Sequence, residues 1–287
     1  MSRGAAPALA ALLTLAAAAA HAQAPAPTPK PTPRPRGAGI GIGTLAWIDR
    51  ELERAELPNK SSWERLREGA PLRTGDSFRS APDATARLEF PWMAVTLGGG
   101  AMLTIPASSV LSTVLEQGRA EFAGPGREIV KIKVGDGEVR GGGRLVLRRS
   151  AGRTTATALE GSFRVRAAGQ TVEIKAGQAT VVADGRPPEA ASPLPKSPSA
   201  LEPGKDPFYV RSGRPAQLTW SAASPGHRVE VLALDRDHVL LAREVTAPPL
   251  FLELPWLGTY RWRVAARDAR GVESRPSDPG VICSVDR

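Results

Sequence analysis

The sequence is short of the residue types that most often carry out chemistry. Its 287 residues include one cysteine and three histidines, and only 5% are aromatic. Because a lone cysteine cannot pair within the chain, Cys283 is expected to be a small buried residue on the last strand, with a bridge between molecules as the alternative. The histidines and the cysteine have unrelated spacings, which form no recognisable transition-metal site. We therefore expect neither a metal nor a cofactor.

Nucleophilic catalysis lacks its usual groups. Beyond the N-terminal segment the histidines are His227 and His238, and neither lies near a cysteine or a Gly-x-Ser-x-Gly turn. We expect both at the surface, at strand ends. A carboxylate pair across a cleft is the open alternative. Its candidates all fall at turns or on outward strand positions: Asp76, Glu89, Glu116, Glu121 and Glu160. Aromatic residues that line sugar clefts are scarce, so we expect no catalytic residues and no enzyme.

Long apolar runs are missing except at the N-terminus. There a run follows Arg3 and ends in "AHA" (Ala20–Ala22), which fits the small-x-small rule of signal peptidase. We expect a signal peptide over residues 1–22, with cleavage between Ala22 and Gln23. A membrane span is the alternative, but the run is short for a bilayer and leads into a Pro-rich segment. The expectation is export, most simply to the periplasm, with no integral membrane span after cleavage.

Acidic residues are outnumbered, though modestly. The formal net charge is +9, and residues 1–36 account for four of these charges without any acidic residue, which leaves +5 for residues 37–287. Export and this mild excess argue against nucleic acid as a partner. We expect an envelope protein or an anionic envelope polymer instead.

Alternation of apolar and polar residues marks the rest of the chain. Such alternation indicates half-buried strands, and it is clearest in "ATARLEF" (84–90), "VKIKV" (130–134), "SFRVRA" (162–167) and "TVEIKA" (171–176). Turn signals separate the strands at 98–100, 135–137, 167–170 and 175–178. One charged segment, "LAWIDRELERAEL" (45–57), fits either a strand or an amphipathic helix.

Proline-rich stretches divide the chain. Residues 23–38 are expected to form an extended tether. Residues 185–206 are rich in proline and serine and cannot bury a core, so they are expected to link two globular parts. The fold class predicted for those parts, 39–184 and 207–287, is all-β.

Basic residues occupy outward positions of several predicted strands. If strand registry gathers them on one face, they form an anion-binding or partner-binding face; its residues are Lys131, Lys133, Arg148, Arg164 and Arg166. A solvated sheet face of mixed charge is the alternative, because Glu138, Glu160 and Glu173 are interspersed.

The first part resembles the FecR domain. The segment "SSWERLREGAPLRTGDSFRSAPDATARLEF" (61–90) is similar to the opening of that family, and "LEGSFRVRAAGQTVEIKAGQATVV" (159–182) to its end. The residues that carry the resemblance are Trp63, Leu66, Gly69, Leu72, Gly75, Asp76, Gly161, Gly177 and Gln178. The resemblance implies short, stacked or solenoid-like antiparallel strands, and it favours a strand for 45–57.

The sequence departs from the FecR pattern in places. Gly143-Arg144 stands where a Gly-Thr pair is expected, and Pro91-Trp92 replaces a turn of the Asp-Gly type. A signal peptide precedes the domain, where regulators of this family have a sigma-factor-binding segment and a membrane helix. Their role is therefore not transferred.

The second part resembles a seven-stranded fibronectin type III or Ig-like sandwich. The resemblance rests on "LTW" (218–220) and "YRWRVAARDARGVESRPS" (260–277). It implies that Tyr260 is a corner tyrosine whose hydroxyl bonds back to the chain. Trp220 and Trp262 are expected in the core.

The short segment "RTGDS" (73–77) is expected to be structural. Gly75 supplies a turn, and Asp76 caps it by accepting bonds from amides two residues on. The whole sequence therefore predicts an exported, non-catalytic protein that binds or scaffolds partners in the cell envelope. A periplasmic sensor that acts through a separate membrane partner is the alternative, and an envelope hydrolase is a third.

Overall fold

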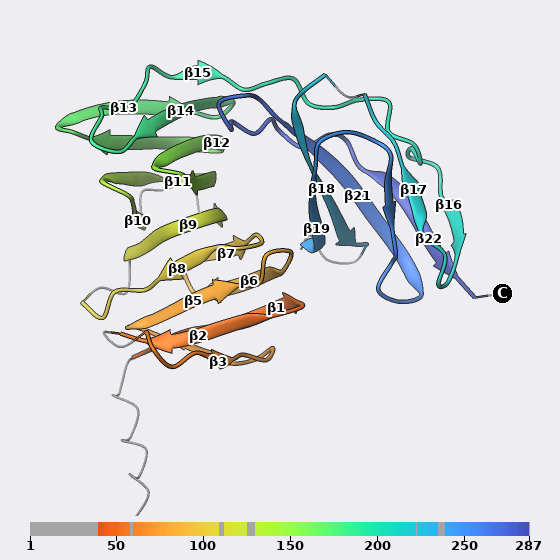
Figure 1. Cartoon of the computed structure of the whole chain (residues 1–287), viewed down its shortest axis with the longest axis horizontal. Helices are drawn as coiled ribbons and strands as arrows, with labels where there is room; N and C mark the ends of the chain where they lie inside the picture. The colour runs from red at the N-terminus through yellow and green to blue at the C-terminus, as the bar shows by residue number, and fades with distance from the viewer. Residues whose placement is uncertain are drawn as a thin grey trace, which may run out of the picture. The chain divides into compact units, whose positions relative to one another are not determined.

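The chain is all-β in every part that the structure describes. The computed structural model describes residues 40–57, 60–108, 112–124, 130–221, 223–234 and 239–286, which belong to one compact unit, Ala38–Arg287. These residues form strands and no helix (Figure 1), so none of them forms a helix able to cross a membrane. The all-β prediction is confirmed. The predicted signal peptide, its cleavage site and the tether lie outside the described residues.

Fifteen strands form one large sheet, which Figure 1 shows as a stack of layers. In chain order they are β1 (Gly41–Asp49), β2 (Leu52–Glu56), β3 (Glu64–Arg65), β4 (Pro71–Arg73), β5 (Asp76–Ser80), β6 (Thr85–Phe90), β7 (Met93–Leu97), β8 (Met102–Thr104), β9 (Ser112–Ala123), β10 (Val130–Val134), β11 (Gly137–Ser150), β12 (Arg153–Ala167), β13 (Gln170–Lys175), β14 (Gln178–Ala183) and β15 (Ser192–Pro193).

The large sheet branches into two ladders. The first runs β4-β1-β6-β7, and the second runs β3-β2-β5-β8; both then pair with β9. The long strands β9, β11 and β12 each belong to both ladders, because their two halves pair with different neighbours. One hydrophobic cluster contains side chains from both ladders, including Leu45, Leu88 and Val95 from the first and Phe78 and Leu103 from the second. The core of the sheet therefore lies between the ladders.

Hydrophobic alternation placed these strands correctly. Ala86, Leu88 and Phe90 of β6 are buried, as predicted. The ambiguous segment 45–57 continues β1 and forms β2, with a turn at Arg50, whose φ is 74°. One pairing differs from the expected antiparallel pattern, because β10 runs parallel to β9.

The last seven strands form two smaller sheets, as expected for the sandwich. They are β16 (Phe208–Arg211), β17 (Ala216–Leu218), β18 (Gly226–Ala233), β19 (Val239–Val245), β20 (Leu250–Leu252), β21 (Gly258–Arg267) and β22 (Gly280–Val285). Five strands pair in the order β16-β22-β21-β18-β19, and β17 pairs with β20. Trp220 and Trp262 pack in their shared core, and the Tyr260 hydroxyl donates to the Trp256 carbonyl oxygen at 2.8 Å. These three predictions are confirmed.

His227 corrects one expectation. It was expected at the surface, but only 1% of it is exposed, and its ring lies edge-on to Trp220 at 5.5 Å. The reason is strand alternation, since His227 shares the inner face of β18 with Val229 and Val231. His238 lies outside the described residues. Cys283 is a free, buried thiol on β22, as expected.

Residues 185–206, the predicted linker, pack along both regions. The Glu189 amide donates to the Val181 carbonyl oxygen, Leu194 donates to Gly177, and Glu202 and Thr219 exchange two bonds. Whether residues 39–184 and 207–287 are separate domains stays a prediction.

Candidate partner-binding surfaces

The residues on which the resemblance to the FecR domain rests occupy turns, the core and one strand crossover. Gly75, Gly161 and Gly177 have positive φ angles, of 89°, 73° and 85°, which suit glycine. Leu72 is fully buried. Further motif residues support turns or packing: Gly69 also has a positive φ, Trp63 lies under the Arg79 guanidinium at 4.3 Å, and the Gln178 side chain accepts a bond from the Lys175 amide.

Asp76 is buried more deeply than we expected for a residue that caps a turn. Only 1% of it is exposed, and its carboxylate accepts a 2.8 Å bond from the Arg73 amide, three residues earlier. The predicted bond to a later amide is therefore wrong. Asp76 also lies 3.6 Å from Nη1 of buried Arg54. Burial raises the pKa of this carboxyl, although the Arg73 amide and the Arg54 charge act in the opposite direction.

We expect Asp76→Ala to lower the free energy of unfolding by about 2–3 kcal/mol, because buried Arg54 loses part of its counter-charge and the Arg73 amide loses its acceptor. Urea denaturation measures the change. Asp76→Asn is the matched comparison, since it keeps an acceptor for the amide and removes only the charge. A loss below about 0.5 kcal/mol for the alanine variant, the range of ordinary surface changes, would contradict this role.

Four of the five predicted basic residues share one face of the second ladder. In strand registry Lys133, Glu138 and Arg166 lie opposite one another, as do Lys131, Arg140 and Arg164. Arg148 does not join them. It lies in the half of β11 that belongs to the first ladder and binds Glu244. The shared face is charge-mixed, because Glu138 pairs with Lys131 and Arg140.

The candidate carboxylates mostly have basic partners. Asp76 lies beside Arg54, Glu89 pairs with Arg87, and Glu116 with Lys60. Glu121 is buried and pairs with Arg119 and Arg144. Among the described residues, no three His, Cys, Asp or Glu side chains gather into a group that could hold a metal ion.

A buried ionic network lies where the first ladder meets the five-stranded sheet and the segment that follows β21. Arg119 of β9 donates from Nε to both carboxylate oxygens of Glu273, at 2.9 and 3.0 Å. On the facing strands, Glu230 of β18 binds Arg228 and Arg263. Arg119, Arg228, Glu230 and Glu273 are each at most 5% exposed. Sequence reasoning missed this network, because it treated outward charges as solvated.

The network controls the ionisation of its carboxyls. Burial alone would raise the pKa of Glu230, yet Arg228 and Arg263 together hold it well below its ordinary value. Glu121 is lowered in the same way by Arg119 and Arg144. Burial is likewise outweighed at Glu244, where hydrogen bonds and charge from Arg148 and Arg267 lower the pKa to about 2. These groups therefore stay charged inside the protein at neutral pH.

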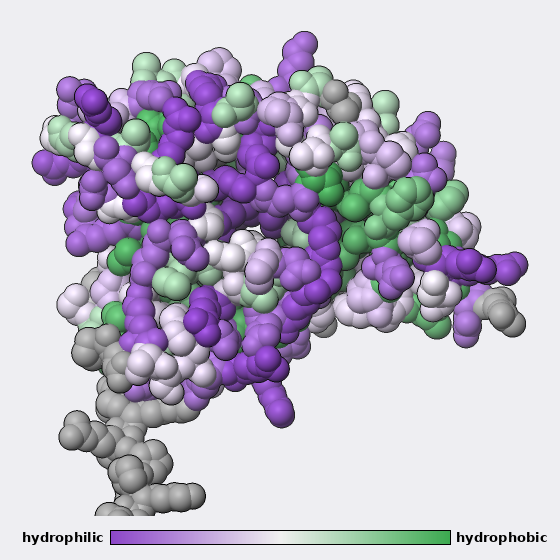
Figure 2. Space-filling model, in the orientation of Figure 1, coloured by the Kyte–Doolittle hydropathy of each residue, from purple (hydrophilic) through white to green (hydrophobic). Residues whose placement is uncertain are grey.

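Large hydrophobic side chains are exposed mainly on the sandwich. Of the seven exposed in the described residues, six lie there: Phe208, Tyr209, Leu234, Phe251, Trp256 and Leu257. Phe208 and Tyr209 belong to β16, the end strand of its sheet, and Phe251 belongs to the two-stranded sheet. Figure 2 shows hydrophobic side chains gathered over the sandwich near β17, whereas hydrophilic ones cover most of the visible large sheet.

Among the comparisons with known proteins, only the one with solved structures gave matches. No family model matches the chain, and neither does any curated protein. Two crystal structures described as a "putative anti-sigma factor" from Parabacteroides distasonis are similar in part. One has 13% identity and a TM-score of 0.35 over 41% of this chain and 59% of its own; the other has 12% and 0.35 over 42% and 68%. This chain thus spans less than two thirds of the first, and a similarity this small carries no conclusion about function.

Proposed function

We propose that the protein is an exported, non-catalytic binding protein of the bacterial envelope, whose sandwich holds an extended segment of a protein partner. The observation that carries this proposal is the placement of exposed aromatic side chains on open strands. Tyr209 is 67% exposed and Phe251 60% exposed, and among the described strands each of the two, β16 and β20, has one neighbour within its sheet.

Open strands offer two sources of affinity. Unpaired backbone groups of an edge strand can pair with an added strand, and exposed rings beside it can bury apolar surface. The other end strand of the five-stranded sheet, β19, is less suitable, since Val239, Leu240 and Leu241 are buried and the strand packs near β1 and β6. The proposed partner strand therefore adds beside β16 or β20.

Crosslinking in intact cells followed by affinity capture tests the proposal. We expect the wild-type protein to capture a specific envelope protein, and the variant Tyr209→Thr/Phe251→Thr to capture about tenfold less of it, because exposed aromatic residues dominate many interfaces. Lys133→Thr, an exposed strand position on the large sheet, is the matched control and should capture the wild-type amount. Recovery of an anionic polymer with no specific protein would overturn the proposal.

A regulatory role is the second candidate. This role rests on the resemblance to the FecR domain, and Gly75, Gly161 and Gly177, which carry part of that resemblance, have the positive φ angles that suit glycine. A FecR-like part would then act through a separate membrane partner. This role predicts a neighbouring gene for a sigma factor or its regulator. It also predicts a changed transcript profile when the protein is deleted; an unchanged profile would exclude it.

A further inference from the structure

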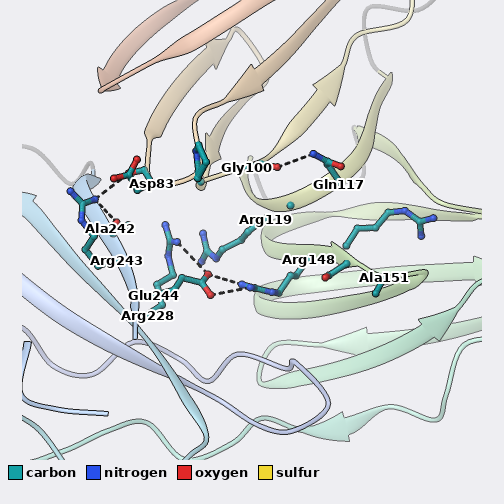
Figure 3. Close-up of a pocket in the computed structure, with 15 residues that line it drawn as sticks. Asp83, Gly100, Gln117, Arg119, Arg148, Ala151, Arg228, Ala242, Arg243 and Glu244 are labelled. Carbon is teal, nitrogen blue, oxygen red and sulfur yellow. Dashed lines mark hydrogen bonds and ion pairs between the residues drawn. The ribbon is translucent and has the colours of Figure 1, made fainter. Parts of the chain in front are cut away.

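A cavity lined by arginines lies where the first ladder meets β18 and β19. Its volume is about 550 Å³ (Figure 3), within the range of small-molecule sites. The turns at Pro82–Asp83, Gly99–Gly100 and Ser150–Ala151 form part of its wall. The charged residues that line it are Arg119, Arg148, Arg149, Arg228, Arg243, Asp83 and Glu244. Five guanidinium groups thus face two carboxylates.

Some of these arginines are neutralised locally. Arg148 makes two bonds to Glu244, at 2.6 and 2.9 Å, and Arg149 makes two to Asp184, at 2.8 and 2.9 Å. Arg243 instead donates to two backbone oxygens, of Asp83 and Ala242. Its nearest carboxylate oxygen among the described residues, that of Asp49, is 3.9 Å away. Arg119 and Arg228 pair with Glu273 and Glu230, which do not line the cavity, so the least neutralised lining arginine is Arg243.

Two buried guanidinium groups have nitrogen atoms without acceptors. Arg119 and Arg228 bind Glu273 and Glu230 through Nε. Nη1 of Arg119 and Nη2 of Arg228 are buried, and no acceptor among the described residues lies within hydrogen-bonding distance of either atom. Unsatisfied charged donors are costly inside a protein. Figure 3 shows the side chains of Arg119 and Arg228 beside that of Glu244.

We propose that this cavity is a binding site for a small molecule that carries a phosphate group. Arginine suits phosphate because its planar fork of donors matches the oxyanion. The ligand lies beside Arg119, Arg228 and Arg243, and its negative charge pairs with Arg243, the least neutralised of the lining guanidinium groups. This site is separate from the open strands of the sandwich, β16 and β20. Its test is therefore independent of the test for the proposed protein partner.

Isothermal titration calorimetry of the mature protein with inorganic phosphate and with glycerol 2-phosphate tests the site. We expect saturable binding that weakens as sodium chloride is raised, because salt screens the charges. Tighter binding of glycerol 2-phosphate indicates a phosphomonoester as the ligand, and equal binding indicates phosphate itself. Binding of citrate without binding of either phosphate probe would overturn the phosphate assignment, as would no binding at all.

Two variants locate the binding. Arg243→Gln should weaken phosphate binding by about tenfold or more, since it removes one charged donor. Ala151→Asp adds a carboxylate at an exposed turn of the wall and leaves the buried network intact, so it should weaken binding while urea denaturation stays unchanged. Arg166→Gln, on the charge-mixed face of the second ladder, is the control. Loss of binding in Arg166→Gln, or wild-type binding in both cavity variants, would overturn the proposed location.

Discussion

Replacing Glu273 with glutamine is expected to lower the free energy of unfolding by about 3–5 kcal/mol, the cost of breaking a buried ion pair by removing one partner. The glutamine keeps nearly the same volume but removes the charge that faces Arg119. Arg119 is 5% exposed and Glu273 is 3% exposed, so water cannot replace the lost counter-charge. Urea denaturation should show a lower midpoint with an unchanged slope.

Two comparisons separate this effect from ordinary charge removal. Glu173→Gln changes an exposed glutamate on β13 and should alter stability by less than about 0.5 kcal/mol. The double variant Arg119→Met/Glu273→Leu removes both charges and should recover most of the loss, because a buried ion pair can often be replaced by apolar residues. If Glu273→Gln were as harmless as Glu173→Gln, the pair would not be buried as the structure has it.

Lowering the pH tests how much the same network contributes to stability, without any mutation. Glu121, Glu230 and Glu244 have pKa values below those of the unfolded chain. Their contribution to stability is therefore present above the ordinary glutamate pKa, near 4.5, and is lost as pH falls through the folded values, which for Glu244 is about 2. Asp76 acts in the opposite sense, because its raised pKa favours the folded state as it becomes protonated. The pKa of Asp49 is raised likewise, but those of Glu138 and Asp184 are lowered as well. Among the described residues five lowered carboxyls outnumber two raised ones, so stability should fall between pH 4.5 and 2.

The sequence predicted the elements whose signals are local. Period-two alternation in β6 and β13 follows from one buried face, and the turn at Gly75 follows from its position in a short polar segment. Tyr260 was predicted from the resemblance to a sandwich, and its hydroxyl bonds to Trp256 as expected. The same local logic could have placed His227 inside, since it alternates in phase with Val229 and Val231.

The buried network could not be predicted in this way. Arg228 and Glu230 occupy the outward positions of β18, which is the pattern of a strand facing water. Both are buried, and Arg119 of β9 lies close enough to that face for its charge to act on Glu230. A polar strand face that is exposed to water and one that packs against another polar face show the same alternating pattern in the sequence. Which side chains enclose the arginine-lined cavity depends on that packing as well.

Gly161→Ala is expected to lower the free energy of unfolding by about 3–5 kcal/mol, through backbone strain together with overpacking. Gly161 lies where β12 passes from one ladder to the other, opposite Gly143 of β11. Its φ of 73° disfavours a side chain, and an added Cβ would lie 2.0 Å from the Gly142 carbonyl oxygen. That oxygen belongs to the backbone of a paired strand, so it cannot move aside without disturbing β11.

Gly169→Ala separates the two causes. Gly169 has nearly the same φ, 77°, but a Cβ there would meet nothing within 4 Å. This variant should therefore lose only the cost of the left-handed conformation, about 1–2 kcal/mol. The difference between the two variants, measured by urea denaturation, is the cost of the close approach of β12 to β11. Equal losses in both would mean that conformation alone requires a glycine at 161, and that the two strands can separate enough to admit a methyl group.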